Sequence, residues 1–231
     1  MRRQGDKGRN VACPDPSAGT RGESPASVTK SLEPAVAGRD TGPIMAGSDF
    51  LTDQFLIAMP AMADTNFAQT VTYIWEHNAD GALGIIINRP LQMKLAEVFE
   101  QLKMPTPTDS VGRQSVLQGG PVQTDRGFVL HHSGGQWEHT RQVSSRIQVT
   151  TSPDILDAMA RGNGPGTAIV ALGYAGWSAG QLEQELVQNA WLTVPADERI
   201  IFDTPFEQRW HAAGRLLGVD LATISPHAGH A

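Results

Sequence analysis

One stretch of the chain, residues 55–90 (FLIAMPAMADTNFAQTVTYIWEHNADGALGIIINRP), constrains the fold more than any other. Within it, residues 70–76 alternate between two faces and are rich in β-branched and aromatic side chains, as half-buried strands are. Residues 77–81 end in Asp-Gly, a pair that readily adopts the positive φ of a tight turn. Residues 83–88 (LGIIIN) then form a second apolar run. The pattern predicts a β-hairpin at the centre of a sheet.

Polar residues stand at the ends of the two predicted strands. Glu76, His77 and Asn78 close the first strand, and Asn88 and Arg89 close the second. We expect the strand ends to lie close enough for a carboxylate, an imidazole and a guanidinium to converge. That combination can bind an anion or carry out acid–base chemistry. The alternative is an Arg–Glu ion pair with an Asn/His turn cap, which would be purely structural.

The rest of the folded part mixes helical and extended patterns irregularly. Apolar or alternating runs predict strands over residues 50–59, 115–118, 127–132, 146–151, 167–172, 191–194 and 199–202. Helical spacing and capping signals predict helices over residues 91–102, 153–161, 178–189 and 205–217. Some neighbouring strands are joined directly and others through helices. We therefore expect an α+β (α/β-type) domain with a mixed sheet.

Two glycine-rich segments are further candidates for a polar site. Gly119 and Gly120 precede a proline and predict a turn. Residues 173–177 (GYAGW) predict a turn between a strand and a helix, where free helix N–H groups could hold an anion. The alternative for Gly173 to Trp177 is a tight crossover turn with the Trp177 ring packed in the core.

Histidines near the middle of the chain are weak evidence for a metal site. His131 and His132 are adjacent on a predicted strand, so their side chains point to opposite faces. Glu138 and His139 follow, but the spacing matches no zinc motif. We therefore expect no bound metal and no cofactor, and no residue stands out as catalytic.

Residues 1–47 differ in composition from the rest of the chain. They hold seven Gly, five Pro and four Ser and contain no aromatic residue, so they cannot bury enough apolar surface to offset ordering. We expect a disordered extension or an artefact of the assigned start, with a single domain over residues 48–222 and a flexible tail over residues 223–231. The basic-arm alternative is disfavoured because its basic residues are dispersed.

Charge and composition bear on partners and compartment. Residues 48–231 carry eleven basic and nineteen acidic side chains, a net charge of −8 that repels phosphate backbones at long range. No run of apolar residues reaches the length of a membrane span, and no apolar signal region follows the basic start. A single cysteine, Cys13, excludes an intrachain disulfide. We expect a cytoplasmic protein without direct nucleic-acid or membrane binding.

Several blocks of sequence resemble one bacterial family. The blocks include FLIAMPAM, YIWEHNADGALGIIINRPL, LQGGPVQTDRGFVLHH, TTSPDIL, ALGYAGWSAGQLEQELVQNAWL and a Thr-Pro pair shortly before Trp210. Over about residues 50–220 the chain resembles the AlgH/YqgE family. The resemblance implies a compact single domain with a mixed, partly barrel-like sheet flanked by helices, in a cytoplasmic bacterial protein. Some family members are described as regulators of alginate production or transcription, and no catalytic residues carry over.

Three functional hypotheses follow from these observations. The first is a non-enzymatic regulator that binds a small anionic ligand or a protein partner. The second is an enzyme that uses Glu76, His77 and Arg89. The third is a DNA-binding transcriptional regulator, which the acidic charge disfavours.

Overall fold

The computed structural model describes residues 50–107 and 110–224, which belong to one compact unit. The predictions for residues 1–47, for Cys13 and for nearly all of the tail lie outside the described residues. In the described part of the chain, no helix has both the length and the apolar character needed to span a membrane.

The strands are spread over the whole described chain. They are β1 (Gln54–Ala58), β2 (Val71–Asn78), β3 (Gly81–Ile86), β4 (Pro90–Lys94), β5 (Ser115–Gln118), β6 (Val122–His132), β7 (Thr140–Gln142), β8 (Ile147–Thr150), β9 (Ala168–Ser178) and β10 (Trp191–Pro195). The helices are short by comparison. They are α1 (Leu95–Gln101), α2 (Asp154–Ala160), α3 (Gln181–Val187), α4 (Glu198–Phe202), the 3₁₀ helix η1 (Phe206–Gln208) and α5 (Arg209–Leu216).

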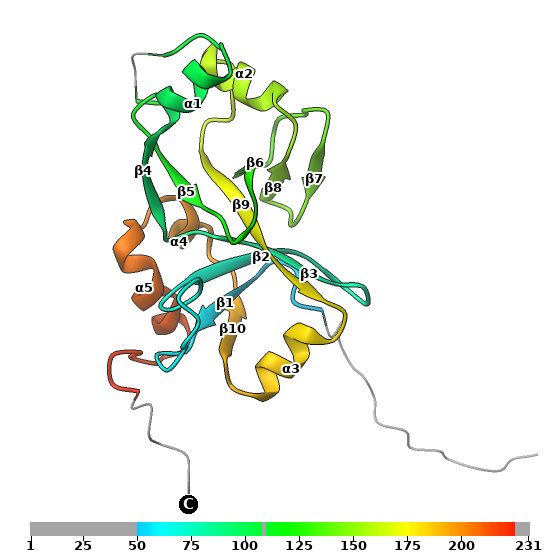
Figure 1. The fold of residues 1–231 in the computed structure, drawn as a ribbon, viewed down its shortest axis with the longest axis vertical. Coiled ribbons are helices and arrows are strands. Elements are labelled where there is room, and N and C mark those ends of the chain that lie inside the picture. Colours follow the sequence, from blue (N-terminus) through cyan, green and yellow to red (C-terminus); the bar gives the residue numbers. More distant parts are fainter. Residues whose placement is uncertain (1–49, 108–109, 225–231) are drawn as a thin grey trace, which may run out of the picture. The chain divides into compact units, whose positions relative to one another are not determined.

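The strands form one mixed, curled sheet of half-barrel form, in the order β10-β1-β2-β3-β9-β6-β8-β7. Strand β9 holds its two halves together, because its first part pairs with β6 and its last part pairs with β3. β5 also joins β9, in parallel, and β4 pairs with β5. Figure 1 shows β9 running through both halves, with α1 and α2 beside one half and α3 beside the other.

Three buried clusters fill the fold. The main cluster contains Phe55, Tyr73 and Ile85, each fully buried, and is covered by side chains of α4 and α5. A second cluster lies under α1 and α2, and a third lies under α3. Burying each large apolar side chain stabilises the fold by about 1.5–3 kcal/mol. The predicted β-hairpin is confirmed as β2 and β3, and its first strand supplies Tyr73 to this main cluster.

One predicted helix is confirmed only in its later part and one predicted strand is wrong, and local hydrogen bonds explain both. The predicted helix over residues 91–102 begins as strand β4, and α1 starts only where Glu97 accepts a hydrogen bond from the backbone N–H of Lys94 (2.8 Å). The predicted strand over residues 199–202 is helix α4. Its N-cap residue Asp197 accepts a hydrogen bond from the N–H of Arg199 (2.9 Å), which favours a helical start.

The predicted turn over residues 173–177 is also wrong, since these residues lie inside the long strand β9. Gly173 (φ +74°) lets β9 bend without ending, and α3 starts later, after Gly180. The bend passes close to the β5–β6 connection. A Cβ on Gly120 would lie 2.1 Å from the carbonyl carbon of Tyr174, so only glycine permits this crossing.

Candidate functional site

The polar residues at the two ends of the β2–β3 hairpin do not converge. Glu76 pairs with Leu83 next to the turn, whereas Asn88 lies five residues beyond Leu83, at the open end. At the rise of an extended strand this separation is roughly 17 Å. The expectation that a carboxylate, an imidazole and a guanidinium would meet is therefore wrong. Both groups of polar residues stand at the carboxyl end of their strand, and the carboxyl ends of two antiparallel strands lie at opposite ends of a hairpin.

His77 has a structural environment. Its side chain is 1 % exposed, its Nδ1 accepts a hydrogen bond from the N–H of Leu51 (2.8 Å), and its Nε2 lies 2.8 Å from Glu183 Oε1. Because Nδ1 is an acceptor here, the proton must sit on Nε2 and is donated to Glu183. His77 thus ties the segment before β1 to helix α3.

Asn88 and Arg89 fasten the open end of the hairpin. Asn88 accepts from the N–H of Val71 (2.9 Å) through its Oδ1 and donates to the carbonyl of Gln69 (2.9 Å) through its Nδ2. Arg89 donates to the carbonyl of Ala68 (2.9 Å). These bonds satisfy backbone groups that the ladder leaves free, so both side chains act as turn anchors.

The glycine-rich candidates are packed rather than open. A Cβ on Gly119 would lie 2.3 Å from the carbonyl oxygen of Gly173, so their backbones approach each other too closely to cradle an anion. Trp177 is buried, and its indole N–H donates to Glu185 (2.9 Å). Their placement matches the packing alternative, in which Trp177 belongs to the core.

Among the described residues, no cluster of His, Cys, Asp and Glu is arranged to hold a metal ion. His131 is fully buried, and its ring contacts the carbonyl of His132 (2.9 Å) and the hydroxyl of Thr150 (2.8 Å). Burial lowers the pKa of His131, which keeps the ring neutral. His131 is therefore a buried polar group satisfied within the sheet.

Glu76 and Trp75 of β2 lie beside a cavity that the sequence patterns did not indicate. Glu76 Oε2 lies 2.9 Å from Arg141 Nη1, and Asn78 donates to Glu76 Oε1 (3.2 Å). Arg141 in turn lies over the ring of Trp75, 5.8 Å from the ring centroid. Trp75 and Arg141 both line a cavity of about 300 Å³, which we call the aromatic cavity.

The aromatic cavity has aromatic walls and a basic rim. It is lined by Trp75, Leu83, Arg126, Phe128, His139, Thr140, Arg141, Val149, Thr151 and Tyr174. The Phe128 ring centroid lies 6.4 Å from that of Trp75 and 5.6 Å from that of Tyr174. The described lining residues include two arginines and no acidic side chain. Flat apolar faces and excess positive charge suit a planar anion.

One polar atom of the lining residue Trp75 has no partner, and it is too deeply buried to open into the cavity. Trp75 is 9 % exposed, and its Nε1–H is buried without a hydrogen-bond acceptor among the described residues. Leaving a buried donor unsatisfied costs about 1–3 kcal/mol. Sequence reasoning assigned Trp75 to a strand face and could not find this cavity, because its walls come from β2, β3, β6, β7, β8 and β9.

Comparison with known proteins gives the family. A family model described as AlgH-like matches residues 55–222. The chain belongs to the AlgH-like family. A UPF0301 protein of Nitrosococcus oceani is 54 % identical over 182 residues, covering 79 % of this chain and 97 % of that protein. A UPF0301 protein of Azoarcus sp. is 57 % identical over 185 residues, covering 80 % and 98 %.

Solved structures agree with this assignment. The solution structure of the AlgH protein from Pseudomonas aeruginosa is 51 % identical, covers 84 % of this chain and 100 % of that chain, and superposes with a TM-score of 0.67. A crystal structure of a Corynebacterium diphtheriae protein, 20 % identical with a TM-score of 0.60, shares the fold; it covers 74 % of this chain and 89 % of that chain. The resemblance to the AlgH/YqgE family is thereby confirmed.

Proposed function

We propose that this AlgH-like chain is a non-catalytic ligand-binding protein whose ligand is a small planar anion held in the aromatic cavity. The observation that carries the proposal is the pair of arginines beside aromatic walls, with no acidic side chain among the described lining residues. The ring of the ligand stacks on Tyr174, and its charge is met by Arg126 and Arg141.

Glu76 adjusts the charge of the cavity without lining it. In its ion pair with Arg141, the arginine is 52 % accessible and Glu76 is 22 % accessible, so solvent screening holds the pair to about 1 kcal/mol. Arg126 has no acidic partner within ion-pair distance among the described residues and contacts the Phe128 ring, 5.5 Å from its centroid. The rim therefore keeps a net positive charge when Glu76 is ionised.

The role that follows is regulation in the cytoplasm through a bound anion or a protein partner. The enzyme alternative requires Glu76, His77 and Arg89 in one cavity, and their separation along the hairpin removes its support. The DNA-binding alternative is disfavoured by the net charge of residues 48–231. These residues carry eleven basic and nineteen acidic side chains, and their net charge of −8 repels DNA phosphates.

A thermal-shift assay on the full chain tests the proposal, with benzoate, pyridine-3-carboxylate and uridine monophosphate as probes and pyridine-3-carboxamide as the uncharged control. We expect at least one anion to raise the melting temperature; a ligand at 100 times its Kd stabilises by about 2.7 kcal/mol. The effect should be lost in Arg126→Gln and Arg141→Gln. Arg161→Gln, which removes an exposed arginine at the end of α2, should leave it unchanged. If no anion stabilises the chain, or if Arg161→Gln abolishes the effect equally, the proposal is wrong.

A further inference from the structure

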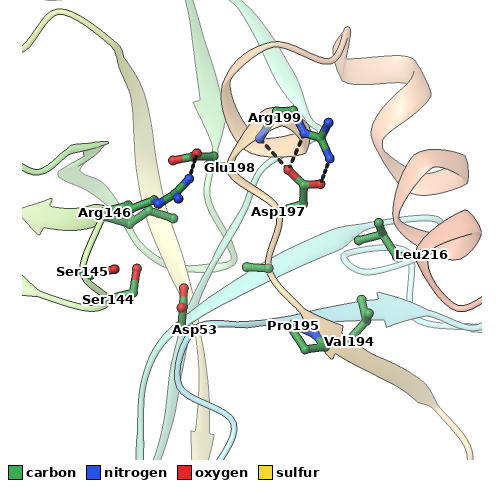
Figure 2. Close-up of a pocket in the computed structure, with 12 residues that line it drawn as sticks. Asp53, Ser144, Ser145, Arg146, Val194, Pro195, Asp197, Glu198, Arg199 and Leu216 are labelled. Atoms are coloured by element: carbon green, nitrogen blue, oxygen red, sulfur yellow. Dashed lines mark hydrogen bonds and ion pairs between the residues drawn. The ribbon is translucent and has the colours of Figure 1, made fainter.

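A second cavity lies at the turn of the β7–β8 hairpin. Its volume is about 770 Å³, and its walls are the segment before β1, the turn between β7 and β8, the end of β10 leading into α4, and Leu216 of α5. We call it the acidic cavity. Figure 2 shows Asp53 beside the serines of the β7–β8 turn, with the charged residues at the start of α4 above them in this view.

The charges that line the acidic cavity do not cancel. Arg146 pairs with Glu198, and Arg199 pairs with Asp197 through two contacts of 2.8 and 3.2 Å. Figure 2 shows each arginine bonded to the carboxylate of its own partner. Asp53 is the remaining charged residue of the lining, and the described residues provide it with no cationic partner. The lining thus carries one unpaired negative charge.

Asp53 is held in place before any ligand arrives. The hydroxyl of Tyr73 donates to Asp53 Oδ1 (2.8 Å), the Asp53 N–H donates to the carbonyl of Ile74 (2.9 Å), and the Asp53 carbonyl accepts from the N–H of Ala196 (3.1 Å). Tyr73 is fully buried, and burial raises its pKa far above the usual range, so the phenol remains a donor.

The backbone of Asp53 supports the same conclusion. Its φ of +64° is a left-handed conformation that costs a non-glycine residue about 1–2 kcal/mol. The surrounding hydrogen bonds maintain this conformation, which presents the carboxylate beside the cavity. Because Tyr73 contacts Oδ1 alone, Oδ2 keeps its lone pairs available. A carboxylate fixed in this way needs little reorganisation when it binds a cation.

The other lining residues indicate which groups a ligand of this cavity would carry besides a positive charge. Ser144 and Ser145 bring hydroxyl groups, while Val194, Pro195 and Leu216 provide apolar surface. We propose that the acidic cavity is a binding site for a small aliphatic amine, whose ammonium group pairs with Asp53 and whose polar end meets the serine hydroxyls. This site is separate from the aromatic cavity, so either proposal can fail while the other holds.

A titration of the full chain with 4-aminobutan-1-ol tests this proposal, at constant ionic strength and monitored through the backbone amide signals of Asp53 and Ala196. We expect saturable shifts of both signals. Butane-1,4-diol, which has the same length and no charge, should produce none. Asp53→Asn preserves the shape of the side chain and should weaken amine binding at least about tenfold, equivalent to about 1.4 kcal/mol.

Asp80→Asn is the matched control, because it removes one negative charge from the exposed turn between β2 and β3. It should leave amine binding unchanged. The proposal is overturned if the amine causes no saturable shift, if the diol binds equally well, or if Asp80→Asn weakens binding as much as Asp53→Asn does.

Discussion

The aromatic cavity and the acidic cavity are walled by the same β7–β8 hairpin, yet they leave opposite charges unpaired. Thr140 and Arg141 face the first cavity, and residues 144–147 face the second. In the aromatic cavity an arginine shares its charge with one half-buried glutamate, and a second arginine remains. In the acidic cavity both arginines are neutralised and an aspartate remains. The ligand charge that we propose for each cavity therefore follows from the side chain that lacks an ionic partner there.

The two cavities also differ in the kind of unpaired group that each presents and in the contacts that hold it. The unpaired group of the aromatic cavity is the guanidinium of Arg126, which lies over the Phe128 ring. The unpaired group of the acidic cavity is the carboxylate of Asp53, which is held by a buried phenol and two backbone hydrogen bonds. The first arrangement favours a ligand that stacks and carries negative charge, and the second favours one that donates hydrogen bonds and carries positive charge.

The largest expected effect comes from the crossing of β9 and the β5–β6 connection, which lies next to Tyr174 of the aromatic cavity. Gly120→Ala places a Cβ 2.1 Å from the backbone of Tyr174 and should destabilise the fold by about 3 kcal/mol or more, measured by urea denaturation. Anion binding should fall as well, because Tyr174 lines the aromatic cavity, whereas amine binding to the folded protein should change less. Gly127→Ala is the control within β6, since a methyl group added there would meet no other atom within 4 Å. An equal loss of both activities in folded Gly120→Ala would contradict the separation of the two cavities.

A smaller effect concerns the anchoring of β8 to β6 by His131. The pKa of His131 is lowered by burial, so the unfolded chain takes up this proton first as the pH falls below about 6.5. The free energy of unfolding should therefore decrease between about pH 7 and pH 5. Urea denaturation across this pH range should show a smaller decrease of the free energy of unfolding in His131→Gln than in the unchanged chain. An identical pH dependence in the variant would mean that other groups anchor the shared hairpin against acid.

The smallest effect separates the two cavities electrostatically. Glu76→Gln should change the free energy of unfolding by less than about 0.5 kcal/mol, because solvent screens its ion pair with Arg141. It frees the charge of Arg141, so anion affinity should rise by about threefold, equal to about 0.6 kcal/mol. Amine affinity should stay constant. Calorimetric titrations with both probes check this, and a change in amine affinity would show that the cavities are electrically coupled.

Local patterns predicted much of the fold. The alternation of residues 70–76 and the following Asp-Gly predicted the β2–β3 hairpin, because hydrophobic period and turn chemistry act over a few residues. The same reasoning failed at residues 173–177, where glycines typical of a turn instead let β9 bend and pass close to Gly120. A close approach between distant backbones leaves no local signature that separates it from a turn.

For the candidate site, the sequence by itself determined the residue types and the element that carries them. It placed Trp75 and Glu76 on a strand and showed an acidic domain with few basic residues. Only the tertiary structure decided that Glu76 meets Arg141 rather than Arg89, and that Asp53 lacks a cationic partner among the described residues. The physical reason is that a cavity and its unpaired charge depend on which distant segments the sheet brings together, whereas sequence patterns report only near neighbours.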